Sequence, residues 1–218
     1  MLRIVFMCSG GGGNLRFVHE VIRLGLLGDA EKCGVITDRE CAAGLFAKQQ
    51  NIPVMECDFS ESNQPSLKTT LMDLCPGIIV TNVHKIISVA VVELFRGKLI
   101  NLHYSLLPAF GGVIGAKAIT QALEYGAKVV GTTAHLVDHR VDAGPPVVQA
   151  VIPVMPDDEL SVLMDIVFRV GCISLLTSMQ IISEDRNVLS GAVHFLSEVS
   201  GRSVMFSPSV ASVREFQE

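Results

Sequence analysis

The sequence has few charged residues and no basic run, and this scarcity excludes one class of partner. Charged residues make up 18% of the 218 residues, and the formal net charge is −5. A nucleic-acid interface needs clustered lysine and arginine, which neither the overall charge nor any local stretch supplies. We therefore expect no nucleic-acid partner, although a small anion remains compatible with the chain.

Cysteine clusters and long hydrophobic runs are missing as well. The six cysteines form no CxxC pair and no Cys/His group at metal spacing. We therefore expect reduced thiols, no metal and a cytoplasmic protein. No 18 apolar residues follow one another, which argues against a membrane-spanning segment. The short apolar run at the N-terminus leads into glycines, unlike a signal peptide.

What the sequence does contain is an alternation of short apolar runs with amphipathic ones. This pattern is typical of an α/β fold with a parallel sheet and crossover helices. Strands are expected at 2–8, 32–37, 52–57, 77–81, 97–100, 129–137 and 145–154. Helices are expected at 14–27, 40–50, 64–74, 89–95, 116–125 and 157–182, the last with acidic residues in its first turn. Residues 1–182 then form the main domain, and 183–218 a C-terminal extension, interpreted as a hairpin packed on the core.

The segment SGGGGN, residues 9–14, lies between the first expected strand and the first expected helix. Four glycines allow a ligand to approach the backbone closely, and the free N–H groups of a helix start bind anions. The spacing fits neither GxGxxG nor a P-loop. Two interpretations stay open here: a small phosphate or carboxylate site, and a tight turn capped by Asn14.

Two further segments place polar groups where ligands bind in open α/β sheets, at the carboxyl ends of strands. In NLHYSLLP, Asn101 and His103 are two residues apart, so on extended chain their side chains point the same way. In TTAHLVDHRVDAGPP, His135 lies on a strand and Asp142 follows in a loop. A carboxylate beside an imidazole raises its pKa and orients it. Both segments also allow a structural interpretation without a ligand. Asn101 and His103 could form a satisfied hydrogen-bond pair, and the loop that contains His139 could be an ordinary solvated loop.

Together these segments resemble the 10-formyltetrahydrofolate-dependent formyltransferases, most closely the phosphoribosylglycinamide formyltransferase branch. The resemblance extends over residues 1–182 and depends on SGGGGNL, NLHYSLLP and GTTAHLVDHRVDAGPPVVQAVIPV. It implies a Rossmann-like, mostly parallel sheet with helices on both faces. It also implies transfer of a formyl group from 10-formyltetrahydrofolate to an amine, in the purine pathway if that amine is glycinamide ribonucleotide.

The resemblance also implies roles for individual residues. Asn101 polarises the formyl oxygen, His103 stabilises the oxyanion, and Asp142 supports a charged His103 and relays protons. His135 helps to order the site. The folate would be held by two segments, His84, Lys85, Ile86 and Ile87 with Asp138, His139, Arg140 and Val141. The phosphate of the acceptor would be held by Gly11, Gly12, Gly13 and Asn14.

Acceptor recognition departs from the family's pattern. The family has a polar pair three residues apart on the last helix, where this chain has apolar residues near Val167 and Val170. We therefore expect a small amine acceptor, possibly phosphorylated, and either a monomer or a homodimer. Two alternatives are a formyltetrahydrofolate deformylase, which uses water in place of the amine, and a folate-binding protein without turnover.

Overall fold

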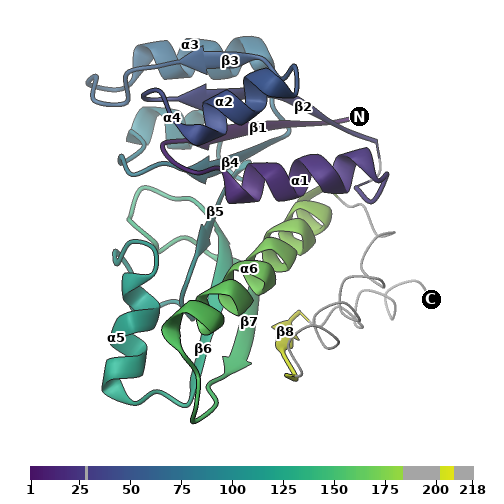
Figure 1. Ribbon diagram of the computed structural model, residues 1–218. Coiled ribbons are helices and arrows are strands. Elements are labelled where there is room, and N and C mark those ends of the chain that lie inside the picture. Colours follow the sequence, from purple (N-terminus) through teal and green to yellow (C-terminus); the bar gives the residue numbers. More distant parts are fainter. Residues whose placement is uncertain (28, 184–201, 209–218) are drawn as a thin grey trace, which may run out of the picture. The chain divides into compact units, whose positions relative to one another are not determined.

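The computed structural model describes residues 1–27, 29–183 and 202–208 (Figure 1). These residues fall into two compact units. The first unit contains residues 1–101 and 136–141, and the second contains residues 102–135 and the chain from residue 142 onward.

The first unit is built on parallel strands. They are β1 (Leu2–Cys8), β2 (Ala30–Thr37), β3 (Val54–Glu56), β4 (Ile78–Asn82) and β5 (Leu99–His103), whose last two residues belong to the second unit. Hydrogen-bonded neighbours follow the order β3-β2-β1-β4-β5, and every pair in this order is parallel. The predicted α/β, Rossmann-like fold with a mostly parallel sheet is thus confirmed.

Helices cover both faces of this parallel sheet. Ile36 of β2 belongs to the apolar core under α3 (Pro65–Leu74) and α4 (Val89–Leu94). Its neighbour Thr37 lies against Gly44 of α2 (Ala42–Gln49). Side chains alternate across a strand, so the two contacts mark opposite faces. α1 (Gly13–Arg23) lies with α2, in front of the strands in Figure 1.

The second unit combines antiparallel strands with two helices. β7 (Pro146–Pro153) pairs with both β6 (Val129–Leu136) and β8 (Met205–Ser207), antiparallel in each case. α5 (Lys117–Tyr125) and α6 (Leu160–Ser183) supply the helical side of the core. Alternate residues of β7, namely Val148, Ala150 and Ile152, are fully buried in this core.

The described part of the C-terminal extension, residues 202–208, carries strand β8. Phe206 is buried in the core of the second unit, and Arg202 pairs with Asp158 and donates to the Pro153 carbonyl. The predicted hairpin falls mainly on residues 184–201 and 209–218, which lie outside the described residues. The hairpin and the boundary at residue 182 therefore stay predictions.

Two helices differ from their predicted bounds by three or more residues at one end. α1 ends at Arg23 because Gly25 takes a left-handed conformation, φ 71°, a common way for a helix to end. α6 begins at Leu160, so the acidic residues 157–159 are not in its first turn. Asp158 instead accepts a hydrogen bond from the Met155 N–H at 2.8 Å and pairs with Arg202. A specific partner therefore determines its place, and the helix dipole does not.

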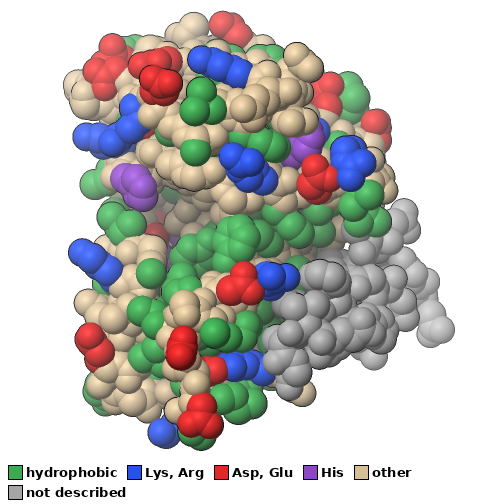
Figure 2. Space-filling view, in the orientation of Figure 1, with side chains coloured by type: hydrophobic (Ala, Val, Ile, Leu, Met, Phe, Trp, Pro, Cys, Tyr) green, Lys and Arg blue, Asp and Glu red, His purple; other side chains and the backbone are tan. Residues whose placement is uncertain are grey.

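The long helix α6 is apolar enough, by length and composition alone, to cross a membrane. However, 61% of its most apolar 18-residue window is buried inside the structure, as is usual for a core helix. On the described surface visible in Figure 2, basic and acidic side chains are interspersed. That face shows no gathered basic patch of the kind that nucleic acid requires.

Gly131 of β6 occupies a place that admits no side chain. A Cβ added there would lie 2.1 Å from the Ala150 carbonyl oxygen and 2.7 Å from a methyl group of Leu106. A contact of 2.1 Å with backbone cannot be relieved by turning a side chain. The close pairing of β6 and β7 therefore depends on glycine at this position.

We expect Gly131→Ala to lower the free energy of unfolding by about 3 kcal/mol or more, because strands or loop must shift to admit a methyl group. Gly10→Ala is the matched control, since no atom lies within 4 Å of an added Cβ there. Its effect should stay below about 1 kcal/mol in urea unfolding. Equal stability of both variants would show that β6 tolerates the methyl group.

Candidate active site

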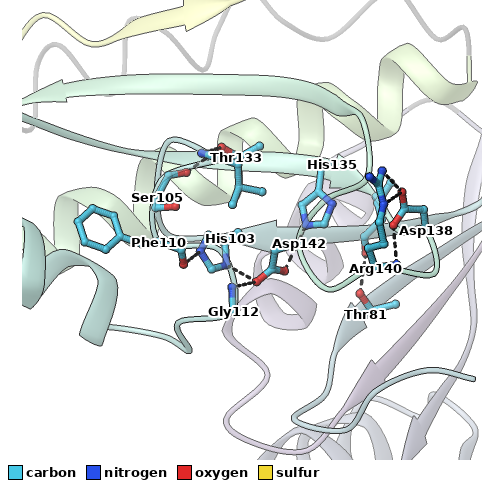
Figure 3. A network of polar contacts seen from close by, with 12 residues as sticks. Thr81, His103, Ser105, Phe110, Gly112, Thr133, His135, Asp138, Arg140 and Asp142 are labelled. Carbon is cyan, nitrogen blue, oxygen red and sulfur yellow. Dashed lines mark hydrogen bonds and ion pairs between the residues drawn. The ribbon is translucent and has the colours of Figure 1, made fainter.

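The carboxylate of Asp142 lies among one backbone N–H and two histidine rings of the second unit (Figure 3). Its Oδ2 accepts from the Gly112 N–H at 2.8 Å and lies 3.4 Å from Nδ1 of His103. Its Oδ1 lies 3.6 Å from Nε2 of His135. The side chain is 13% exposed. The structure thus brings together three residues that the sequence predicted as site residues.

The surroundings of Asp142 keep its carboxylate charged. The hydrogen bond from His135 is the largest cause that lowers the pKa of Asp142, and the Gly112 N–H and the charge of His103 add to it. Burial opposes them, but the pKa remains below its ordinary value. The carboxylate is therefore ionised at neutral pH and can attract a proton or a cation.

Both ring nitrogens of His103 face hydrogen-bond acceptors. Nε2 lies 3.1 Å from the Phe110 carbonyl oxygen, which can only accept, while Nδ1 faces Asp142. Burial lowers the pKa of His103, whereas the carboxylate and the carbonyl raise it, and burial has the larger effect. The ring is buried, and its charged form can donate to two acceptors, the Phe110 carbonyl and the Asp142 carboxylate.

A bulge in the β6–β7 pairing determines where His135 points. The register runs Thr133↔Gln149 and Ala134↔Val148, then shifts so that His135 is opposite Pro146. β-Bulges redirect side chains and are common beside active sites. The His135 side chain is almost fully buried, and its Nε2 reaches the second oxygen of Asp142.

A polar pair that sequence reasoning missed, the buried Thr133 and the half-buried Gln149, holds the loop between His103 and Gly112. Thr133 Oγ1 accepts from the Leu107 N–H at 3.0 Å and donates to the Ser105 carbonyl at 2.7 Å. Gln149 Nε2 donates to the Leu107 carbonyl at 3.0 Å. This loop supplies the Phe110 carbonyl and the Gly112 N–H, so Thr133 and Gln149 fix the partners of the two catalytic candidates. Polar residues within apolar strands were the available signal.

Asn101 lies two residues before His103 within β5. The strand continues to His103, beyond the predicted end at residue 100. Alternation along a strand therefore directs the two side chains to the same side, as expected from the sequence. Joint action of Asn101 and His103 on one oxygen stays a prediction.

The glycine segment places Gly12, not Asn14, at the N-cap of α1. Gly12 has φ 71°, and an added Cβ would lie 2.7 Å from that of Ala43, so this turn requires glycine. Asn14 is inside the helix, where its Nδ2 donates to Oδ1 of Asn82 at 3.3 Å. The interpretation of Asn14 as the cap is wrong. No atom lies within 4 Å of a Cβ added at Gly11, which leaves room for a ligand there.

The two segments predicted to bind folate both belong to the first unit. Residues 84–87 form the loop between β4 and α4, with the Ile86 side chain 75% exposed. In residues 138–141 the Asp138 carboxylate accepts from the backbone N–H of Arg140 at 2.7 Å and pairs with its guanidinium. That hydrogen bond and ion pair lower the pKa of Asp138 and close the turn. Their role in folate binding stays a prediction.

The apolar residues of the last helix are core residues. Val167 and Val170 are fully buried among the side chains of the second unit, so these positions cannot contact an acceptor. Within the described residues, no three histidine, cysteine, aspartate or glutamate side chains form a group that could hold a metal ion.

Comparison with known proteins identifies relatives over most of the chain. The sequence matches the family described as formyl transferase over residues 2–177. The phosphoribosylglycinamide formyltransferase of Mycobacterium tuberculosis is 33% identical over 165 residues, covering 72% of this chain and 74% of that protein. The chloroplastic phosphoribosylglycinamide formyltransferase of Vigna unguiculata is 30% identical, and the match covers 72% of this chain but 53% of that protein. The chain thus spans about half the length of that relative.

Solved structures give the same picture. Glycinamide ribonucleotide transformylase 1 from Symbiobacterium toebii superposes with a TM-score of 0.77 at 27% identity, covering 88% of this chain and 92% of that one. A formyltetrahydrofolate deformylase from Pseudomonas syringae superposes with a TM-score of 0.74 at 23% identity, covering 85% of this chain and 62% of that one. The second likeness concerns the fold alone.

The charge of Asp142 should affect the pKa of His103. We expect NMR titration of the His103 imidazole to give a midpoint below the ordinary histidine value of about 6.5, and Asp142→Asn to lower it further. The reason is that the carboxylate stabilises the imidazolium against burial. Because the pKa of His103 is lower in the folded protein than in the unfolded chain, its contribution to the free energy of unfolding is fully present above the ordinary pKa. This contribution is lost as the pH falls from the ordinary pKa to the lowered one. A midpoint that rises in Asp142→Asn would contradict this electrostatic account.

Proposed function

Because this chain belongs to the formyl transferase family, we propose that it transfers the formyl group of 10-formyltetrahydrofolate to a small amine, with glycinamide ribonucleotide as the leading candidate. The observation that carries the proposal is the ionised Asp142 carboxylate held between His103, His135 and the Gly112 N–H. Such an arrangement suits a reaction that develops negative charge on one oxygen while a proton moves between two nitrogens.

Each predicted residue has a defined task in this reaction. The acceptor nitrogen attacks the formyl carbon, and the carbonyl oxygen becomes an oxyanion. The Asn101 amide and the His103 N–H donate to that oxygen. The proton lost by the attacking nitrogen passes through water beside Asp142 to N10 of the folate, and the bond between the formyl carbon and N10 then breaks. Atoms and charge balance without an oxidant or a metal.

One contact constrains how His103 works. The Phe110 carbonyl engages Nε2 of His103 at 3.1 Å. In the charged ring both nitrogens carry a hydrogen, so the formyl oxygen must share the Nε2 hydrogen with the Phe110 carbonyl or displace that carbonyl, while the Nδ1 hydrogen stays directed at Asp142. The loop anchored by Thr133 and Gln149 consequently controls how readily His103 becomes available to the substrate.

The binding assignments follow the family resemblance. Residues 84–87 and 138–141 hold the pteridine, largely through backbone groups. The segment from Gly11 to Asn14 holds an acceptor phosphate through backbone N–H groups at the start of α1, where the helix dipole favours an anion. The open space above Gly11 supports this assignment. A soluble cytoplasmic monomer or homodimer remains our prediction.

The first test follows turnover directly. Incubation with 10-formyltetrahydrofolate and glycinamide ribonucleotide should release tetrahydrofolate and add one formyl group to the amine, as measured by absorbance and product mass. A panel of amino sugars in parallel reports acceptor choice. Release of formate alone would support the deformylase instead, and folate binding without turnover would refute both enzymatic readings.

The second test concerns the site residues. We expect Asp142→Asn and His103→Ala to lower kcat by more than about a hundredfold, within the usual range for proton-transfer and oxyanion groups. Asp165→Asn is the control, because this carboxylate is 58% exposed on α6 and pairs only with Arg169 among the described contacts. Full activity in Asp142→Asn would remove the carboxylate from the mechanism.

A further inference from the structure

Gln64 is a buried amide at the start of α3 that no part of the reaction uses. Its residue is only 2% exposed, and it occupies the N-cap position with φ 50°, in the left-handed region. Glycine or asparagine adopts this conformation at lower cost than glutamine does. The presence of a long amide at a strained position indicates that its side chain has a use.

All three hydrogen bonds of the Gln64 amide join separate segments of the first unit. Nε2 donates to the Phe59 carbonyl at 2.8 Å and to the Ile86 carbonyl at 2.9 Å. Oε1 accepts from the Ser88 N–H at 2.9 Å. Both amide hydrogens and one oxygen lone pair are thus engaged. The side chain therefore binds the backbone of residues 86–88 at two points, the Ile86 carbonyl and the Ser88 N–H.

The segment that Gln64 holds has no regular structure to fix it. Residues 83–88 lie between β4 and α4, and the Ile86 side chain is 75% exposed. Ser88, held by its N–H, also caps α4 by accepting from the Val91 N–H at 3.4 Å. The Ile86 carbonyl and the Ser88 N–H belong to the two peptide groups that flank Ile87, and one buried side chain orients both of them. The Ile87 side chain adds an apolar contact with the core of the first unit.

We propose that Gln64 is a positioning residue for donor binding: it presets the backbone of residues 84–88 so that this loop can hold the pteridine. The inference rests on the proposed function, in which this loop grips the folate through backbone groups. A loop fixed before binding loses less conformational freedom when the ligand arrives. Gln64 therefore acts on donor affinity and not on the chemical step.

The experiment separates positioning from general stability. Gln64→Gly deletes the amide and also relieves the left-handed backbone, so its cost in stability is partly offset. Gln64→Glu keeps an acceptor for the Ser88 N–H but sets a carboxylate oxygen against two carbonyls. Both variants should raise the KM and the Kd for 10-formyltetrahydrofolate by about tenfold or more. They should leave kcat at saturating donor, and the KM of the acceptor, within about threefold.

Two controls and one direct measurement complete the design. Leu67→Ala truncates a fully buried residue of the same helix, so it should lower the melting temperature without changing the Kd of the donor. Gln121→Glu makes the same chemical change on the exposed side of α5 and should change neither. Hydrogen exchange of the Ser88 amide should accelerate in Gln64→Gly, which reports the loss of the clamp without any ligand.

The outcomes distinguish the two proposals. Wild-type affinity in both Gln64 variants, with donor bound normally by the wild type, would overturn the positioning role and leave the proposed function intact. Loss of stability equal to that of Leu67→Ala with unchanged KM would do the same. If the wild type binds no 10-formyltetrahydrofolate, the proposed function falls and the positioning role falls with it.

Discussion

The site in the second unit depends on one constraint. The charged carboxylate of Asp142 is largely removed from bulk water, so neighbouring polar groups must stabilise its charge. An unpaired buried charge costs several kcal/mol, so Asp142 can stay ionised only if donors reach it from all sides. The three that do come from the end of β5, from β6 and from the loop at Gly112. Compensation of a single charge therefore determines where three separate pieces of backbone must lie.

Polar side chains perform a similar task at two other places. Thr133 and Gln149 bind the backbone of the loop after His103, and Gln64 binds the backbone of the loop after β4. In each case a side chain on a strand or at the start of a helix holds the backbone of a loop. A fully satisfied buried network favours one arrangement strongly, because breaking it leaves polar groups without partners. Side-chain hydrogen bonds of this kind fix the backbone positions of loops at the ligand-binding edge of a sheet.

The sequence predicted the elements well where one physical signal dominates. β1 matches its predicted bounds because the run Leu2–Cys8 is apolar except for Arg3 and ends where Ser9 and the glycines begin. Long-range partners could not be foreseen: α6 starts late because Asp158 is used by Arg202, forty-four residues away, and Asn14 turns to Asn82. The approach of His103 to Asp142 was implied by family resemblance, not by spacing. Gln64 stands at the start of the expected helix 64–74, and nothing local reveals that its side chain bonds to the backbone of another loop.

The glycine at position 131 has a consequence for how the chain finds its structure. A slip of β6 by one residue would bring Val130 or Thr132 to the place where only a hydrogen fits beneath the Ala150 carbonyl. The same slip would exchange the two faces of the strand and carry His135 away from the carboxylate. Steric exclusion at this one point therefore disfavours the slipped register, so the same glycine that lets β6 and β7 pair closely also selects the alignment in which His135 faces Asp142.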